Sequence, residues 1–233
     1  MGLFYDSYKE VYSDYDYLKI ICCNCKDLSY KYHLRIKNKS DVMVYRNGDF
    51  LRKFSSFDGN LYPFSKDLTV RGTWFQKYSF KTVKFVIIGK YSRRFDWGWA
   101  KPIPLTDPVT DIPYYVGAGG SCTWKIAFDE QGNYADKFLQ TIVFPHDLKD
   151  VDEVENYLRQ MLANILQSKF AEYVAEKGYS LEKYAYDFYF LNQASQDIFP
   201  DLQKYFLDYG VELDNISANS LLLHFLLMPC VPT

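Results

Sequence analysis

The chain has 233 residues, of which 48% are hydrophobic and 24% charged, and its formal net charge is −2. This composition is ordinary for a globular protein of one large or two small domains. The chain has five cysteines, an odd number, and its N-terminus lacks the pattern of a secretory signal, so a disulfide framework is not expected. No run approaches the roughly 20 apolar residues of a membrane span. Together these features favour a reducing, cytoplasmic environment.

The net charge hides an uneven distribution along the chain. Residues 26–101 hold 17 Lys and Arg against 6 Asp and Glu, a net of +11, whereas the rest holds 10 against 23, a net of −13. Such a split suggests either an anionic partner for the basic part or contact between basic and acidic parts, which in an assembling protein could join one subunit to the next.

The first half of the chain is dominated by short strand-like runs. A short helix is expected over residues 4–17, followed by strands over 17–22, 30–37, 42–45, 73–80 and 83–89. Asn47-Gly48 between two apolar runs predicts a hairpin turn. Gly117–Gly120 predicts a break before a further strand over 121–128.

The second half changes to helical spacing. A short helix is expected over 136–142 and a long one over 149–177, which Gly178 would end. Ser180 is a plausible N-cap for a helix over 181–191, and another helix is expected over 200–209 with Pro200 in its first turn. A closing strand follows over 211–217. The pattern predicts an α+β fold, with an N-terminal antiparallel-rich β region followed by helices and a closing strand.

Several groups of reactive side chains were weighed as chemical sites. Cys22, Cys23 and Cys25, with His33 nearby, have the spacing of one zinc knuckle but no second one, so no metal site is expected. His146 lies in a loop where Asp147 or Asp150 would cap the next helix, and a catalytic histidine there stays an alternative. The acidic cluster Asp152, Glu153 and Glu155 is interpreted as a solvated helix start rather than an acid–base pair.

A basic strand with interleaved tyrosines is the best candidate for an anionic partner. It carries Lys31, Arg35, Lys37 and Lys39 beside Tyr30 and Tyr32. Such a strand can bind lipid headgroups or single-stranded nucleic acid, or it can be a solvated face. An anionic membrane surface is the favoured partner of the two.

A proline-rich run follows the apolar strand of residues 83–88. It reads Trp97-Gly98-Trp99-Ala100-Lys101-Pro102-Ile103-Pro104-Leu105-Thr106-Asp107-Pro108. Because proline cannot donate to a ladder, strand pairing is expected to stop or move to a sheet edge here. Asp107 before Pro108 favours a turn. None of these residues is an obvious nucleophile, base or metal ligand, so the run is interpreted as architecture.

The same run carries a resemblance to a known family. Trp97-Gly98-x-x-x-Pro102-Ile103-Pro104-x-x-Asp107-Pro108 resembles the W-G-x-x-x-P-I-P-x-x-D-P run of a bacterial, virion-core-protein-like branch of the SPFH or band 7 superfamily, to which prohibitins and stomatins are distantly related. Four other segments resemble the family in the same order: 40–48, 119–128, Asp136-Lys137-Phe138-Leu139, and Tyr209-Gly210-Val211-Glu212-Leu213-Asp214-Asn215-Ile216. The resemblance divides the chain into an extension with strands over 1–39, the SPFH-like domain over 40–219 and an apolar tail over 220–233.

The resemblance implies an α+β domain that self-associates at or near a membrane and acts as a scaffold, with no catalytic residues and no cofactor. The leading hypothesis is therefore a non-enzymatic, self-assembling scaffold, cytoplasmic or peripheral at the inner face of a membrane. A binding module for nucleic acid or anionic lipid, using the basic strand, is the alternative. A hydrolase using His146 or the carboxylates is the third. The apolar run 221–228 could be a buried final element, an interfacial anchor, an oligomer contact or an altered gene end.

Overall fold

The computed structural model describes residues 9–13, 18–25, 32–36, 40–46, 49–55, 81–130 and 132–225. The chain divides into two compact units, each built from two separate stretches of sequence. Unit 1 comprises residues 1–91 and 128–153, and unit 2 comprises residues 92–127 and 154–233.

Unit 1 contains the N-terminal strands and a short helical segment. β2 (Leu18–Cys25), β6 (Lys81–Gly89), β4 (Ser40–Arg46) and β5 (Asp49–Ser55) form an antiparallel sheet in the order β2-β6-β4-β5. The pairing of β4 with β5 confirms the predicted hairpin. β1 (Lys9–Ser13) pairs in parallel with β3 (Tyr32–Ile36). The helix expected over 4–17 is therefore wrong where the structure describes it, because Lys9–Ser13 are extended.

The helical part of unit 1 matches the short helix expected over 136–142. It comprises α1 (Asn133–Phe138) and the π-helix η2 (Leu139–Val143). Four of its apolar side chains are fully buried: Phe138, Leu139, Ile142 and Val143. The strand expected over 73–80 lies outside the described residues.

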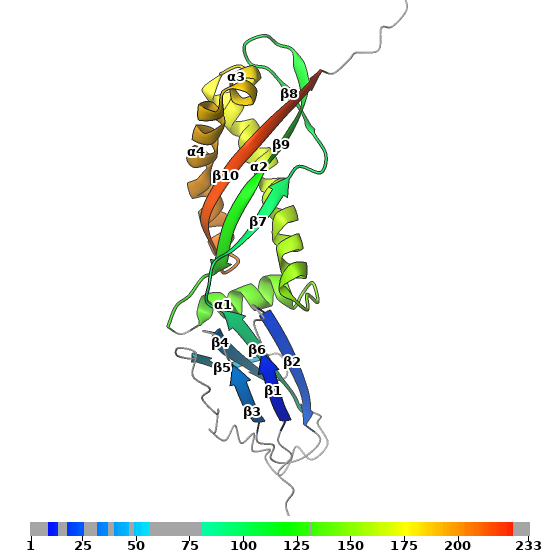
Figure 1. Cartoon of the computed structure of the whole chain (residues 1–233), viewed down its shortest axis with the longest axis vertical. Coiled ribbons are helices and arrows are strands. Elements are labelled where there is room, and N and C mark those ends of the chain that lie inside the picture. Colours follow the sequence, from blue (N-terminus) through cyan, green and yellow to red (C-terminus); the bar gives the residue numbers. More distant parts are fainter. Residues whose placement is uncertain are drawn as a thin grey trace, which may run out of the picture. The chain divides into compact units, whose positions relative to one another are not determined.

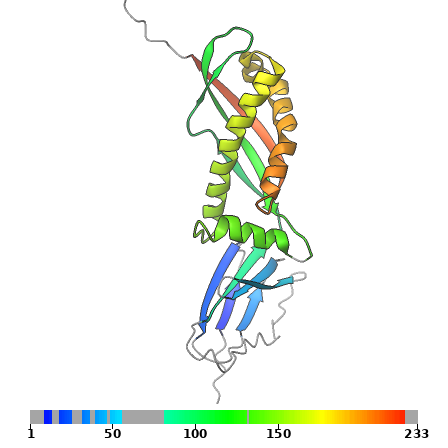
Figure 2. The ribbon, with the colours of Figure 1, turned by 180° about the vertical axis from the view of Figure 1, so that it is seen from behind.

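Unit 2 has a sheet with helices on one face. β10 (Val211–Phe225), β9 (Pro113–Ile126) and β7 (Arg93–Gly98) pair in that order, and β8 (Ile103–Thr106) also pairs with β9, all antiparallel. α2 (Val151–Lys177), α3 (Leu181–Tyr186) and α4 (Phe188–Leu207) lie on one side of this sheet (Figures 1 and 2). The α+β class and the closing strand are as the sequence predicts.

The core of unit 2 lies between the sheet and the helices. Side chains from every layer are almost completely buried there, among them Trp124, Ile126, Leu158, Leu162, Leu202 and Phe206. The helical spacing over 149–177 corresponds to α2, whose buried positions recur every three or four residues along one face. No helix in the described ranges combines the length and the apolar character needed to cross a bilayer.

Several boundaries differ from the sequence prediction. The helix expected over 181–191 is wrong, because α3 ends at Tyr186 and the extended residue Asp187 begins α4. The break expected at Gly117–Gly120 is wrong, because β9 runs through it without interruption. A Cβ on Gly120 would lie 1.9 Å from the backbone oxygen of Ser217 on β10, so glycine here allows two strands to approach closely. The helix expected to begin at Pro200 is also wrong, since Pro200 lies inside α4. β10 extends past residue 217 to Phe225 and includes the first part of the apolar tail.

Candidate functional site: an aromatic end held by Asp107

The proline-rich run spans the end of β7, the whole of β8 and the start of the β8–β9 turn. Trp97 and Gly98 end β7, and Pro102 comes just before β8. Pro104 lies within β8, which pairs with β9 alone among the described strands. A proline in that position is compatible with a strand at the sheet edge, where one of its sides carries no ladder. Ile103 also lies in β8, opposite Val116 of β9.

Two tryptophans of the run pack toward the helices. Trp97 is buried, and the ring of Trp99 meets the ring of Phe170 on α2 edge-on, with centroids 5.8 Å apart. Neither indole N–H has a hydrogen-bond partner among the described residues. Both rings line a cavity of about 20 Å³ whose other walls are largely apolar. A cavity of this size holds about one water molecule, so it is too small for an organic substrate.

The side chain of Asp107 joins distant parts of unit 2 through hydrogen bonds. It is completely buried. Its Oδ1 accepts hydrogen bonds from the backbone N–H groups of Val109 and Thr110, at 2.8 and 2.9 Å. Its Oδ2 accepts from the hydroxyl of Ser180 at 2.8 Å and from the backbone N–H of Leu181 at 2.7 Å. One carboxylate therefore holds both the β8–β9 turn and the first residues of α3.

These bonds change the acidity of Asp107. Burial by itself would raise the pKa of the carboxyl group, but hydrogen bonds from Ser180 and from the N–H groups of Thr110, Val109 and Leu181 outweigh it. The pKa falls from 3.8 to about 2. The carboxylate is thus charged at neutral pH and fully occupied as an acceptor, which suits a structural anchor and not a general base.

The corner between α3 and α4 is made by two short capping interactions. Ser180 caps α3, as its sequence position predicts, and accepts a hydrogen bond from the Glu182 N–H at 3.3 Å. Asp187 ends α3 and also caps α4, accepting from the Tyr189 N–H at 2.9 Å. Because a single residue separates the two helices, the chain turns sharply and its flanking side chains face the solvent.

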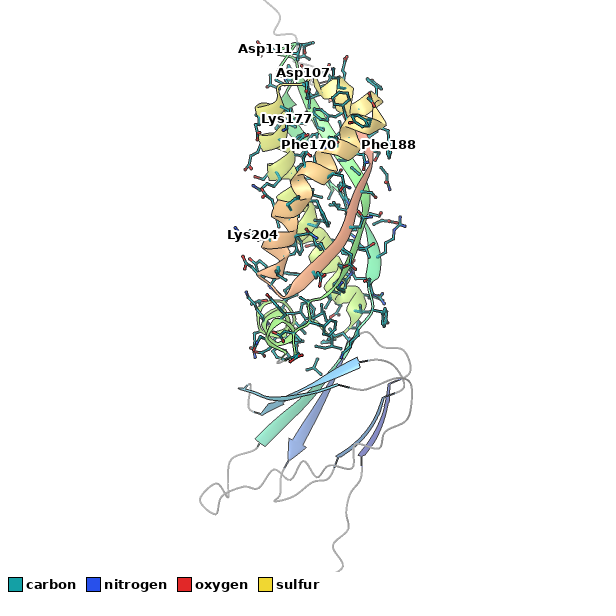
Figure 3. All side chains as sticks on the ribbon, turned by 90° about the vertical axis from the view of Figure 1, so that its left-hand side faces the viewer. Asp107, Asp111, Phe170, Lys177, Phe188 and Lys204 are labelled. Atoms are coloured by element: carbon teal, nitrogen blue, oxygen red, sulfur yellow. The ribbon has the colours of Figure 1, made fainter. Side chains whose placement is uncertain are left out.

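This corner, the loop before α3 and the β8–β9 turn together form what we call the aromatic end. Eleven large apolar side chains are exposed among the described residues, and six of them belong to these segments: Val109, Ile112, Tyr179, Tyr186, Phe188 and Tyr189. Tyr186, Phe188 and Tyr189 are 84%, 65% and 69% exposed. Figure 3 shows Asp107, Asp111 and Phe188 at the same end of unit 2, with Lys204 far from them.

A lysine lies among the rings of the aromatic end. The ammonium group of Lys183 is 4.8 Å from the ring centre of Tyr179 and 5.2 Å from that of Phe190. Both distances are within the range of cation–π attraction. The exposed ring of Tyr179 is therefore held by Lys183 and by the ring of Phe190.

The other candidates from the sequence do not come together in one site. Asp150 caps α2 by accepting from the Glu153 N–H at 2.9 Å, and Glu153 itself accepts from the Lys149 N–H at 2.7 Å. Glu155 forms an ion pair with Arg93 at 2.6 Å. His146 is exposed in the loop before α2. These carboxylates act in capping and in an ion pair. Within the described ranges, no group of three or more His, Cys, Asp or Glu side chains could hold a metal ion.

The basic strand is described only in part. Two strands contain the partly described candidates: β3 contains His33 and Arg35, and β2 contains Cys22, Cys23 and Cys25. The side chains of these five residues lie outside the described part of the structure. Lys31, Lys37 and Lys39 lie outside it altogether. Binding of an anionic partner by this strand stays a prediction.

The aromatic end was not predicted from the sequence. Two of its signals were visible there, the Asp107-Pro108 turn and the Ser180 cap, but they stand 73 residues apart and nothing in the pattern joins them. Comparison of the sequence with models of known protein families and with curated proteins gave no match.

Proposed function

We propose that this protein is a non-enzymatic, self-assembling scaffold of the SPFH or band 7 kind, cytoplasmic or peripherally attached to a membrane. The observation that supports it best is the aromatic end, an exposed apolar surface with a built-in framework. Contiguous exposed apolar surface marks a site of contact with another protein or a membrane, because leaving it in water is unfavourable.

The large aromatic rings give this surface enough apolar area for its burial to contribute to assembly. A phenylalanine or tyrosine buries on the order of 150–250 Å² when it is covered. At about 25 cal/mol per Å² of apolar area, covering Tyr186, Phe188 and Tyr189 would each contribute up to a few kcal/mol. Tyrosine and phenylalanine are also enriched at protein interfaces, where a rigid ring gives area with little loss of side-chain freedom.

The framework under the rings reduces the cost of binding. Asp107 holds the turn that carries Val109 and Ile112, and Asp187 holds the corner that carries Tyr186 and Phe188. A surface whose backbone is already ordered loses less conformational freedom when a partner covers it. This is the behaviour expected of an assembly contact.

Sedimentation velocity of the purified chain tests the proposal. The wild type is expected to sediment as a species larger than a monomer, and the variant Y186S/F188S/Y189S is expected to shift toward the monomer. Leu207→Ser is the matched control, because Leu207 is 37% exposed on α4 outside the aromatic end and its loss should leave the sedimentation coefficient unchanged. A wild-type chain that stays monomeric at all salt concentrations overturns the proposal.

Membrane attachment is tested separately with the same variants. Tyrosine rings suit the boundary between lipid headgroups and acyl chains. Co-sedimentation with vesicles of phosphatidylcholine and phosphatidylglycerol should fall for Y186S/F188S/Y189S and not for Leu207→Ser if the aromatic end contacts lipid. If the wild type and both variants are recovered equally with vesicles, any membrane contact is made by another part of the chain.

A further inference from the structure

The charged side chains around the aromatic end are mostly acidic. Asp111 is exposed in the β8–β9 turn, Glu182 is exposed on α3, and Asp187 is exposed between α3 and α4. Figure 3 shows Asp111 at the same end of unit 2 as Phe188. The segments that form the aromatic end, residues 107–112 and 178–189, contain a single Lys or Arg, which is Lys183. The exposed rings are therefore surrounded by net negative charge.

The position of Lys183 shows what kind of group these rings attract. Its ammonium group lies 4.8 Å from the ring centre of Tyr179 and 5.2 Å from that of Phe190. A ring attracts a cation because its face carries negative partial charge. Tyr186 and Phe188 are 84% and 65% exposed, so they offer further rings to a partner. An aromatic surface with carboxylates at its rim fits a partner that carries several cationic side chains.

The same chain contains a segment with that chemistry. Residues 30–39 contain Lys31, Arg35, Lys37 and Lys39 and no Asp or Glu. All four cationic residues are at odd-numbered positions of the sequence. Because alternate residues of a strand point to the same face, this pattern predicts a row of positive charge. The segment belongs to unit 1, whereas the aromatic end belongs to unit 2.

We infer, on the basis of the proposed self-assembly, that the aromatic end of one copy binds the basic segment 30–39 of a second copy. Opposite charges at the rim select the partner and its orientation. The rings add cation–π attraction and apolar area. The anionic partner that the basic strand calls for is then the aromatic end of a neighbouring copy.

A contact between two different surfaces leaves each bound pair with one unused aromatic end and one unused basic segment. A third copy can therefore add at either side, and the assembly either closes into a ring or continues as a chain. A contact between two aromatic ends would instead use both surfaces at once and stop at a dimer. The two arrangements differ in how they respond when a single surface is blocked.

Mixing two blocked variants distinguishes these arrangements. K31E/R35E/K37E/K39E changes only the basic segment, and Y186S/F188S/Y189S changes only the aromatic end. In sedimentation velocity each variant alone is expected to be a monomer. Their equimolar mixture is expected to form a heterodimer and nothing larger, because the mixture can join the intact aromatic end of the first variant to the intact basic segment of the second.

The other outcomes separate this contact from self-assembly as such. If K31E/R35E/K37E/K39E assembles like the wild type, the contact is overturned, self-assembly stands, and the basic strand is left for another anionic partner. If the two variants are folded by circular dichroism and their mixture stays monomeric, the contact is overturned as well. A monomeric wild type overturns both the contact and the proposed self-assembly.

A conservative variant tests the same contact without changing the basic segment. D111N/E182Q/D187N removes three carboxylates and keeps the size of each side chain. Asparagine tolerates the φ of 56° at position 111 and can still cap α4 at position 187. Because each carboxylate would lose a cationic partner, the dissociation constant of the assembly should rise about tenfold at low salt. The difference should disappear in about 0.5 M NaCl, which screens exposed charges.

The matched control is D201N/D208N/E212Q, which removes three carboxylates of unit 2 outside the aromatic end. Its dissociation constant is expected to equal that of the wild type. A dissociation constant of D111N/E182Q/D187N that equals the wild-type value overturns the contact. A rise of the same size in the control also overturns it, since the effect would then follow net charge and not the aromatic end.

Discussion

Replacing Asp107 by asparagine removes the charge from the buried carboxylate with almost no change in size. The four hydrogen bonds that the carboxylate accepts come from Val109, Thr110, Ser180 and Leu181. An asparagine oxygen can keep two of them. Its amide nitrogen is a donor, so it would face two further donors, and the β8–β9 turn or the start of α3 would lose its anchor.

The size of the effect follows from the pKa. The carboxyl pKa is lowered from 3.8 to about 2 in the folded protein. At 1.36 kcal/mol per pKa unit, the charged form contributes about 2 kcal/mol to the free energy of unfolding at neutral pH. The asparagine amide N–H groups would also face two of the N–H or O–H donors that now bind the carboxylate, which destabilises the fold further. We therefore expect Asp107→Asn to lower the free energy of unfolding by about 2–4 kcal/mol. The melting temperature should fall by about 5–10 °C.

Urea unfolding followed by tryptophan fluorescence measures this cost. Three of the four tryptophans, Trp97, Trp99 and Trp124, belong to unit 2, so the signal reports mainly on the unit that Asp107 stabilises. Asp111→Asn is the control. Asp111 is exposed in the same turn with a φ of 56°, a conformation that asparagine tolerates, so its variant should match the wild type within about 0.5 kcal/mol.

The pH dependence gives a second, independent check. Because the folded pKa lies below the unfolded one, the stabilisation is complete above about pH 4 and is lost as the pH falls toward about 2. The stability difference between wild type and Asp107→Asn should therefore shrink by about half of the ionic contribution at pH 3. A difference that stays constant between pH 7 and pH 3, or a cost below about 0.5 kcal/mol at pH 7, would refute the reasoning.

Three further predictions concern the core and the assembly. Gly120→Ala should lower the melting temperature strongly or prevent folding, because its Cβ would lie 1.9 Å from the Ser217 oxygen, whereas Gly117→Ala meets nothing closer than 3.9 Å and should be nearly neutral. Burial raises the pKa of the Cys122 thiol to about 12, so iodoacetamide at pH 8 should modify it only in denaturant; peptide mapping that shows rapid modification without denaturant would contradict its burial. If the basic segment 26–101 contacts acidic parts of a neighbouring subunit, the sedimenting assembly should become smaller as NaCl rises from about 0.05 to 0.5 M, and an assembly indifferent to salt would exclude that contact.

Local patterns in the sequence predicted most of the described elements. Period-two alternation found β3, and the helical spacing of apolar residues found α2. Turn and cap chemistry found the β4–β5 hairpin and the cap at Ser180. These features depend on residues a few positions apart, so neighbouring residues suffice to predict them.

Errors arose where distant contacts override local preference. Glycine-rich sequence usually ends a strand, but Gly117–Gly120 continue β9, because Gly120 gives the close approach that β10 and Trp97 require. Proline is favoured in the first turn of a helix, but Pro200 lies inside α4, which starts at the Asp187 cap instead. At Gly120 the close packing against β10 outweighs a strand preference of about 1 kcal/mol.

The sequence by itself determined the α+β class of this protein, its main helices and strands, and a proline-rich run without an obvious nucleophile, base or metal ligand. Only the tertiary structure decided what that run does. Asp107 reads locally as the start of a turn, yet its carboxylate reaches α3 and holds the aromatic end together. The length of β10 likewise depends on its pairing with β9, which continues past two register shifts. Hydrogen bonds between residues far apart in the chain leave no periodicity in the sequence, because they depend on where the folded backbone brings their partners.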